Sequence, residues 1–408
     1  MTTTAPGAAA PGSGPGSEPA GTQPAGHAPP MWLIFSLTVT GILGNILVAP
    51  ALPDLAKDLD VSTASAGLVI TAATVPGIVL APIIGVLADR YGRRRVLLPC
   101  LVAFATFGSL GGLAPNLGVL LALRVGQGFG SAGLVNLAVV LIADHWEGTE
   151  RARRIGMNAA VLTSSLAVMP IVGGTLAGLG SWRLAFTPYL LGGLTAVAVA
   201  RNLAPTRPRT DVTWRDQLRD IPGALRAPGV AATMAVGVVI FILLFGLILT
   251  TLPFHLDGEF GLSASGIGAM LAIPAISSTI VAMSLGRFRR RWGSGTLVSV
   301  GMLLLGIAFA GLGLSPTLVV VAVFGLVYGC GEGLVVPSLQ DRVAEGAAPA
   351  VRGTVIAIWV GAVRMGQAAG PALAGALAGL GVPALFVAGG VVAALAAAVV
   401  RVTDVAHR

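Results

Sequence analysis

Long hydrophobic runs alternate with short polar breaks along most of the chain. Each run approaches or exceeds the roughly 20 residues that an α-helix needs to cross about 30 Å of hydrocarbon. Turn signals such as Ala114-Pro115-Asn116 separate the runs. The pattern predicts an all-α membrane protein with twelve spans, at residues 32–50, 64–87, 96–114, 117–142, 154–178, 182–202, 230–253, 263–286, 295–314, 316–338, 351–379 and 382–401.

Polar stretches divide the predicted spans into two sets of six. Residues 203–229, in the middle of the chain, predict a linker between an N-terminal six-helix bundle (31–202) and a C-terminal six-helix bundle (230–402). Residues 1–30 are rich in Ala, Pro, Gly, Thr and Ser and lack the positive charges of a secretory signal, so we expect a disordered tail. Residues 403–408 predict a second, short tail.

The two predicted bundles repeat each other at a constant offset of 201 residues. Segments 170–180 and 371–381 are identical at seven of their eleven positions, and the same offset pairs Gly85 with Gly286. A parallel duplication of this kind is typical of transporters whose binding site lies between two pseudo-symmetric halves.

Composition and charge support a membrane protein and exclude a nucleic-acid-binding one. Only 10% of the residues are charged, whereas soluble domains have about 25%. If both termini are cytoplasmic, the cytoplasmic segments hold 21 of the 25 Lys and Arg residues, and the remainder are Lys57, Arg183, Arg124 and Arg364. This bias follows the positive-inside rule and predicts a multi-pass protein of the plasma or inner membrane, embedded in the lipid bilayer, with both tails cytoplasmic.

The sequence lacks the motifs of common enzyme classes. The sole lysine, Lys57, follows an alanine, so there is no phosphate-binding loop, and no HExxH or GxSxG pattern occurs. Cys100 and Cys330 show no metal-ligand spacing. We therefore expect neither an enzyme nor a cofactor or metal site, and active transport would have to use an ion gradient.

The segment GVLADRYGRRR at 85–95 closes the second predicted span. A carboxylate among arginines and glycines can pair internally in one conformation and release its partner in another. We expect a cytoplasmic gate formed by Gly85, Asp89, Arg90, Gly92 and Arg93. The alternative is that these basic residues only orient the loop toward the cytoplasm.

This segment resembles the signature loop of the major facilitator superfamily. Residues 123–128 resemble the fourth-helix motif of that superfamily, and residues 44–54 resemble the first-helix motif of its drug:proton antiporter branch. Residues 170–174 resemble the fifth-helix antiporter motif, although Met169 stands where glycine usually precedes the proline. The similarity covers about residues 31–401 and is greatest to twelve-span bacterial multidrug or siderophore exporters.

The resemblance implies the major facilitator fold, a monomer, and a proton gradient as the driving force. It assigns the antiporter motif to Pro170, Gly173 and Gly174 and a role in proton coupling to Arg124.

Arg124, Glu332 and Arg364 lie deep in predicted spans, where an unpaired charge costs several kcal/mol. Glu332 is the one carboxyl well inside the predicted membrane, and burial favours the neutral form that a proton carrier must adopt. A fixed Glu332–Arg364 ion pair would instead make both residues structural. Because the first span offers only Asn45 before Asp54, the proton-coupling candidates are Arg124, Glu332 and Asp54.

The leading hypothesis is a secondary transporter that exports amphipathic small molecules in exchange for protons by alternating access, as in multidrug efflux and antibiotic resistance. The alternative is a proton symporter or facilitator that takes up a small anionic metabolite, and a non-transporting membrane receptor is a remote third. We expect a largely apolar central cavity. Its candidate contacts are Asn45, Gln127, Met157, Asn158, Met169, Phe241, Phe245, Tyr328, Trp359 and Arg364.

Overall fold

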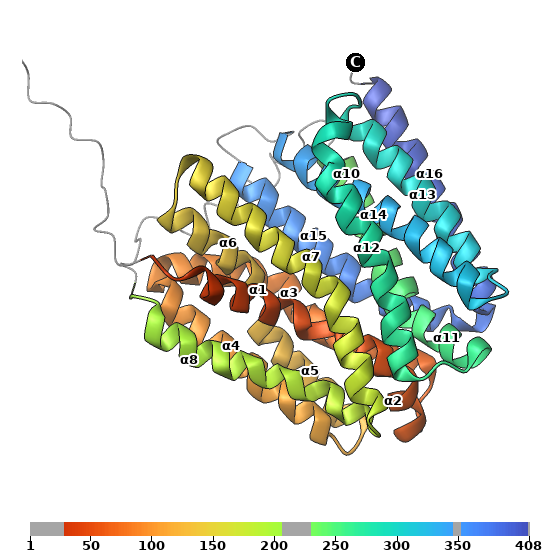
Figure 1. Cartoon of the computed structure of the whole chain (residues 1–408), viewed down its shortest axis with the longest axis horizontal. Helices are drawn as coiled ribbons and strands as arrows, with labels where there is room; N and C mark the ends of the chain where they lie inside the picture. The colour runs from red at the N-terminus through yellow and green to blue at the C-terminus, as the bar shows by residue number, and fades with distance from the viewer. Residues whose placement is uncertain (1–27, 206–229, 346–351, 407–408) are drawn as a thin grey trace, which may run out of the picture.

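The computed structural model describes residues 28–205, 230–345 and 352–406, and every regular element within these ranges is a helix (Figure 1). The first half contains α1 Met31–Ile46, η1 Ala49–Ala51, α2 Leu52–Asp58, α3 Thr63–Tyr91, α4 Arg93–Leu110, η2 Gly111–Leu113, α5 Leu117–Ser131, α6 Leu134–His145, α7 Gly148–Gly178, η3 Trp182–Leu190 and α8 Leu191–Asn202. The second half contains α10 Val230–Leu243, η4 Leu244–Thr251, α11 Leu252–Phe260, α12 Ala264–Arg289, α13 Ser294–Gly313, α14 Leu318–Glu345, α15 Arg352–Ala376, η5 Ala378–Leu380 and α16 Val382–Ala406.

The prediction of an all-α membrane protein is confirmed. Eleven helices of the described chain are long and apolar enough to cross a membrane, where the sequence predicts twelve. The place of the eleventh predicted span, 351–379, is taken by α15, a helix of 25 residues. This helix carries the polar residues Arg364 and Gln367. The predicted tail 1–30 and linker 203–229 fall mostly outside the described residues, and α16 continues into the predicted tail 403–408.

The first long helix of each half is broken at an equivalent position. In the first half α1 gives way to η1 and α2, and in the second α10 passes into η4, a π-helical stretch, and then α11. Pro53 and Pro253 stand within the first two positions of α2 and α11, just after the helix type changes. Such local changes of helix type are frequent at functional sites.

Hydroxyl groups stabilise the wide turns of η4. Thr250 Oγ1 donates to the Phe245 carbonyl at 2.8 Å, and Thr251 Oγ1 donates to the Gly246 carbonyl at 2.9 Å. Both acceptors lie five residues back, so these side chains follow the spacing of the π-helix itself. The sequence pattern does not predict this irregularity.

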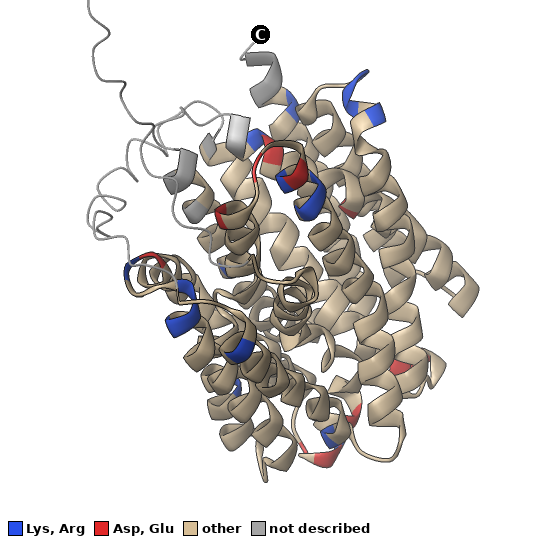
Figure 2. Ribbon diagram, turned by 60° about the vertical axis from the view of Figure 1, so that its left-hand side comes forward, with Lys and Arg blue, Asp and Glu red and all other residues tan. Residues whose placement is uncertain are grey.

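Charged side chains distinguish the two ends of the bundle (Figure 2). One end carries the junctions α3–α4, α6–α7 and α12–α13 with most of the arginines, and we call it the arginine-rich end. The other end carries α2 and α11, and we call it the opposite end.

The two halves meet closely toward the opposite end. Gly174 on α7 and Gly268 on α12 face each other, and a Cβ atom on either glycine would collide with the backbone of the facing helix. On the other side of the molecule, Thr71 Oγ1 of α3 donates to the Ala368 carbonyl of α15 at 2.9 Å. Small residues allow this approach, because interhelical packing in membranes depends on close contact rather than on hydrophobic burial.

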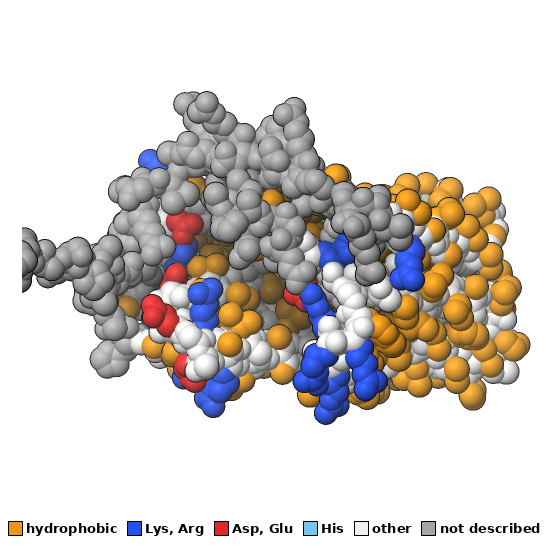
Figure 3. All heavy atoms as spheres, turned by 90° about the horizontal axis from the view of Figure 1, so that it is seen from above, with side chains coloured by type: hydrophobic (Ala, Val, Ile, Leu, Met, Phe, Trp, Pro, Cys, Tyr) orange, Lys and Arg blue, Asp and Glu red, His pale blue; other side chains and the backbone are white. Residues whose placement is uncertain are grey.

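An ion pair also crosses between the halves at the opposite end. Lys57 Nζ on α2 lies 2.7 Å from Asp257 Oδ1 on α11. The other ion pairs found between described residues each lie within one half. The face seen in Figure 3 is hollowed, with hydrophobic side chains inside the hollow and charged side chains around it. The halves are thus joined at the opposite end and separated toward the arginine-rich end.

We expect the glycine contact to hold the opposite end closed more strongly than the ion pair does. The Lys57 side chain is 64% exposed, so its pair with Asp257 is worth about 0–1 kcal/mol. A Val side chain at Gly174 overpacks a backbone contact, which costs about 1–3 kcal/mol. Gly174→Val should therefore open this end by roughly fivefold or more in population, and Lys57→Gln by less.

Electron-spin distance measurements between labels at Thr63 and Glu259 would follow this opening, in a chain whose two native cysteines are replaced. Opening by Lys57→Gln as large as that by Gly174→Val would contradict this ranking.

Candidate functional site

A cavity of about 390 Å³ lies between the two halves. The first half contributes α1, α3, α5, α6 and α7, and the second contributes α10, η4, α12, α14 and α15. This volume suits a small organic molecule. Most of the lining is apolar, and its polar side chains are Asn45, Gln127, Ser131, Asn136, Thr163, Ser278, Tyr328, Glu332, Gln340, Arg364 and Gln367.

Most of the predicted cavity residues line this space. Those that do are Asn45, Gln127, Phe241, Phe245, Tyr328, Trp359 and Arg364. Asn158 lies elsewhere on α7, buried, where its Oδ1 accepts a hydrogen bond from Thr38 Oγ1 at 2.7 Å. Met169 packs against the hydrophobic core and Met157 is exposed, so neither lines the cavity.

The repeat offset of 201 residues relates the two walls of the cavity to each other. Three polar or charged pairs at this offset line it: Gln127 with Tyr328, Ser131 with Glu332, and Thr163 with Arg364. Leu166 and Gln367 are also such a pair. Two cavity residues that were not predicted, Ser131 and Thr163, stand at the repeat positions of Glu332 and Arg364, which were predicted, so the repeat carried a signal for them. Helical spacing is a second signal for cavity residues, because the lining residues of α14 recur every four positions: Tyr328, Glu332, Val336 and Gln340.

Arg124 lies directly behind the first-half wall and is 0% exposed. Its Nη2 donates to Asn45 Oδ1 at 2.7 Å, and its Nη1 donates to Gln127 Oε1 at 2.6 Å and to the Tyr189 hydroxyl at 3.2 Å. Its Nε donates to the Val69 carbonyl at 3.0 Å. All these acceptors are neutral. The guanidinium therefore fixes two cavity side chains while keeping a full positive charge in the interior.

Several polar atoms of the cavity residues have no hydrogen-bond partner in the described structure. They are Nε2 of Gln127, the hydroxyl of Tyr328 and Oε1 of Gln367. All three atoms are buried, and buried polar groups are almost always hydrogen-bonded. The polar part of the cavity wall is therefore incompletely satisfied by the described residues.

Glu332 and Arg364 both line the cavity but form no ion pair with each other. Ser278 on α12 lines the same cavity as Glu332. Arg364 extends from α15 toward the first half and lies beside Gly77 on α3. The fixed Glu332–Arg364 ion pair, which the sequence allowed as an alternative, is therefore not formed in this structure.

Asp54 lies apart from the other two proton-coupling candidates. It stands on α2 at the opposite end, in the electrostatic neighbourhood of Lys57 and Asp257, and does not line the cavity. The three predicted residues thus occupy three places: behind the cavity wall, on the wall, and at the closed end.

The predicted gate residues cluster where α3 meets α4. Arg93 is 6% exposed, and its Nη1 lies 2.5 Å from Asp89 Oδ1 while its Nε lies 3.1 Å from Asp144 Oδ2 on α6. Gly92 has φ 92°, a conformation that favours glycine, and it lets α3 end and α4 begin within one residue. Sequence analysis missed Asp144, because only the fold brings the end of α6 beside α4.

The other two predicted gate residues lie outside this cluster. Arg90 is exposed, with its guanidinium carbon 5.6 Å from the centre of the Tyr91 ring, and Gly85 has open space around it.

The predicted antiporter motif forms the close crossing between α7 and its neighbours. Pro170 lines the cavity, Gly173 packs against the Leu47 carbonyl at the break of α1, and Gly174 packs against α12. These residues therefore join the cavity wall to the contact between the halves.

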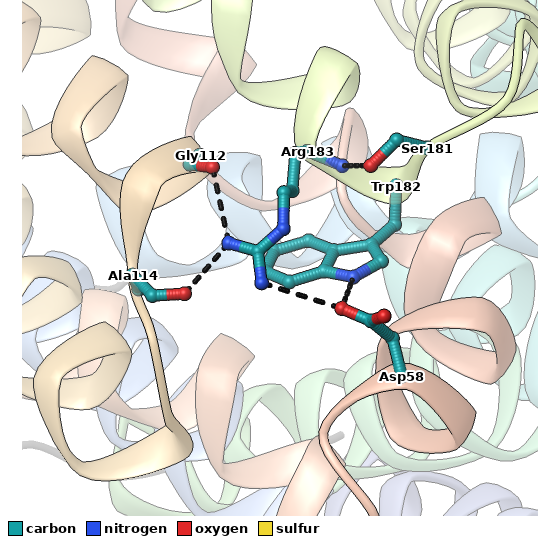
Figure 4. Close-up of polar contacts among 6 residues, drawn as sticks. All are labelled: Asp58, Gly112, Ala114, Ser181, Trp182 and Arg183. Carbon is teal, nitrogen blue, oxygen red and sulfur yellow. Dashed lines mark hydrogen bonds and ion pairs between the residues drawn. The ribbon is translucent and has the colours of Figure 1, made fainter.

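A polar cluster fixes α2 to the rest of the first half (Figure 4). Asp58 Oδ2 accepts hydrogen bonds from Trp182 Nε1 at 2.8 Å and from Arg183 Nη2 at 3.3 Å. Arg183 Nη1 also donates to the Ala114 carbonyl at 2.6 Å and the Gly112 carbonyl at 3.3 Å. The helix that carries Lys57 is thus anchored one residue beyond the ion pair that crosses between the halves.

Within the described residues, no group of His, Cys, Asp or Glu side chains could hold a metal ion.

We expect Arg124→Ala to destabilise the folded protein by more than about 2 kcal/mol, because it leaves several buried acceptors without a donor at about 1–3 kcal/mol each. Tyr189→Phe is the matched control, since it removes one hydroxyl and leaves the guanidinium in place, at a cost of about 1 kcal/mol. Thermal unfolding of both purified variants checks the difference. Equal unfolding midpoints for the two variants would refute the central role of Arg124 in this network.

The sequence was compared with known families and proteins. The sequence model of the Major Facilitator Superfamily matches residues 34–358 and 234–407. The Bacillibactin exporter of Bacillus subtilis (strain 168) is 28% identical over 335 residues, which cover 78% of this chain and 82% of that relative. Cephamycin export protein CmcT of Amycolatopsis lactamdurans is 32% identical over 199 residues, covering 48% of this chain and 40% of that relative.

The fold is similar to that of a bacterial homologue of the human lysosomal transporter Spinster, solved in an inward-facing and unoccupied conformation. The TM-score is 0.73 with 18% sequence identity, over 91% of this chain and 96% of that chain. At this level of identity the likeness shows the fold alone.

Proposed function

The chain belongs to the Major Facilitator Superfamily, and from this premise we propose that it is a proton-driven secondary transporter that exports amphipathic small molecules. The observation that carries the proposal is the central cavity, whose walls come from both halves while the halves meet at the opposite end. Such a cavity is suited to alternating access, in which the halves rock around one site. The exporters of bacillibactin and cephamycin among its relatives favour export as the direction.

We assign the arginine-rich end to the cytoplasm, because cytoplasmic loops collect Lys and Arg. Both termini then lie in the cytoplasm, the protein resides in the plasma or inner membrane, and the structure represents an inward-open state. In this proposal α15 serves as the twelfth membrane helix, completing two six-helix bundles over 31–202 and 230–402. The transporter acts as a monomer and needs no cofactor besides the proton gradient.

Glu332 is the proton carrier in this proposal. It lies on the cavity wall and pairs with no cation among the described residues, so it can lose a proton to the cytoplasm and regain one when the cavity opens outward. Arg124 assists by holding Asn45 and Gln127, which form part of the same cavity. Proton uptake and substrate release then occur in the outward-open state, which gives antiport.

Glu332→Gln should abolish proton movement that depends on substrate. In acidified everted membrane vesicles, lipophilic dyes and antibiotics should release protons with the wild type and not with this variant. Asp54→Asn is the matched control and should retain the release, because Asp54 lies outside the cavity. Release that survives Glu332→Gln would move the proton carrier elsewhere, whereas substrate and protons moving in the same direction would replace export by uptake.

We assign the cytoplasmic gate to the cluster of Asp89, Arg93 and Asp144. Two carboxylates share one buried guanidinium within the first half, so one of them can exchange its partner as the halves close. Gly92 permits the tight junction on which the cluster depends. The second half differs here, since Arg290 occupies the repeat position of Asp89.

We expect Asp89→Asn to lower transport severalfold without loss of folded protein, because Arg93 retains Asp144 as a partner. Glu150→Gln is the control, because Glu150 pairs with Arg153 and Arg154 on the surface. Flux per folded molecule, measured in reconstituted vesicles, checks the expectation. Normal flux in Asp89→Asn would refute the gating role.

A further inference from the structure

Positive and negative groups at the cavity are unequal in number. Among the described residues that line it, Arg364 is the one cation and Glu332 is the one carboxyl. Arg124 adds a second positive charge directly behind the wall, where its hydrogen-bond partners are all neutral. The cavity therefore has a positive balance whether Glu332 is ionised or neutral.

Arg364 makes no hydrogen bond or ion pair with any described residue. Its contact in the first half is with Gly77, where a Cβ atom would lie 3.3 Å from the Arg364 Cδ and 3.4 Å from its Nε. The absence of a side chain at Gly77 leaves room for the guanidinium at the boundary between α15 and α3. Arg124, in contrast, has four partners.

A guanidinium deep in a membrane protein requires either water or an anionic partner, because an unpaired charge there is costly. No described carboxylate pairs with Arg364, although Glu332 lines the same cavity. Its planar fork of donors matches the two oxygens of a carboxylate or sulfonate. The open cavity is the place from which such a group can reach it.

Apolar surfaces surround this charge. Phe241, Phe245 and Trp359 line the same cavity as Arg364, and all three come from the second half. A ligand with an aromatic or aliphatic body and an anionic group would contact the rings with its body and the guanidinium with its charge.

Building on the proposed transport function, we propose that Arg364 binds the anionic group of the substrate, so that the transported molecules are amphipathic organic anions. A carboxylate or sulfonate on an apolar body is the chemistry that this wall recognises. Lipophilic cations of the same size meet two arginines and a single carboxyl, and they bind more weakly.

Two dyes that share a three-ring skeleton test the charge preference: fluorescein, which is anionic, and rhodamine 123, which is cationic. Binding is measured on the purified full-length protein in detergent, from the shift of thermal unfolding with dye concentration. The wild type should bind fluorescein about tenfold or more tightly than rhodamine 123.

Arg364→Gln should lower fluorescein affinity about tenfold or more and leave rhodamine 123 binding unchanged or stronger. Arg364→Lys keeps the charge without the planar fork and should retain part of the fluorescein affinity. Arg401→Gln is the matched control, because it removes one exposed arginine that contacts Thr296 far from the cavity lining. Unliganded unfolding midpoints establish that each variant is folded.

Three results would overturn the proposal: no binding of fluorescein by the wild type, tighter binding of rhodamine 123, or unchanged fluorescein affinity in folded Arg364→Gln. The binding assay contains neither a proton gradient nor a transport direction. Failure of export in everted vesicles, together with retained anion binding, would reject the proposed function and leave the anion site intact.

Discussion

A positive charge inside a membrane protein must find a partner, and this requirement organises the centre of the molecule. The protein meets it in two different ways. Arg124 is surrounded by neutral acceptors from four helical segments and becomes part of the wall. Arg364 has no hydrogen-bond or ion-pair partner among the described residues and lines the cavity. Arg124 therefore stabilises the cavity wall through its hydrogen bonds. Arg364 instead keeps its hydrogen-bond donors available to a bound molecule.

The close approach of helix backbones at glycine positions is the second constraint on the structure. The halves can touch at the opposite end because Gly174 and Gly268 carry no side chains there, and Gly173 admits the break of α1 in the same way. Contacts of this kind act over short distances, so a small rotation of one half removes them together. A transporter that must alternate between two states benefits from such an interface, since a large hydrophobic surface would hold one state too firmly.

The sequence predicts the helical membrane fold, because hydrophobic length, charge placement and the repeat are properties of the chain itself. Most of the residues it suggests for a central cavity line one cavity in the structure. The sequence pattern does not predict the π-helical stretch η4, where threonine hydroxyls donate hydrogen bonds to carbonyls five residues back. It also could not decide whether Glu332 and Arg364 pair, since two residues at similar depth can point in different directions. Asp144 was missed because its role depends on a contact between distant segments.

The duplication that built the cavity has a consequence for how a molecule sits inside it. Related positions on the two walls hold Ser131 and Glu332, and Thr163 and Arg364, so the two charged side chains that line the site both belong to the second half. A bound molecule turned end for end would exchange a guanidinium for a hydroxyl. The cavity therefore presents different chemistry to the two ends of an elongated guest.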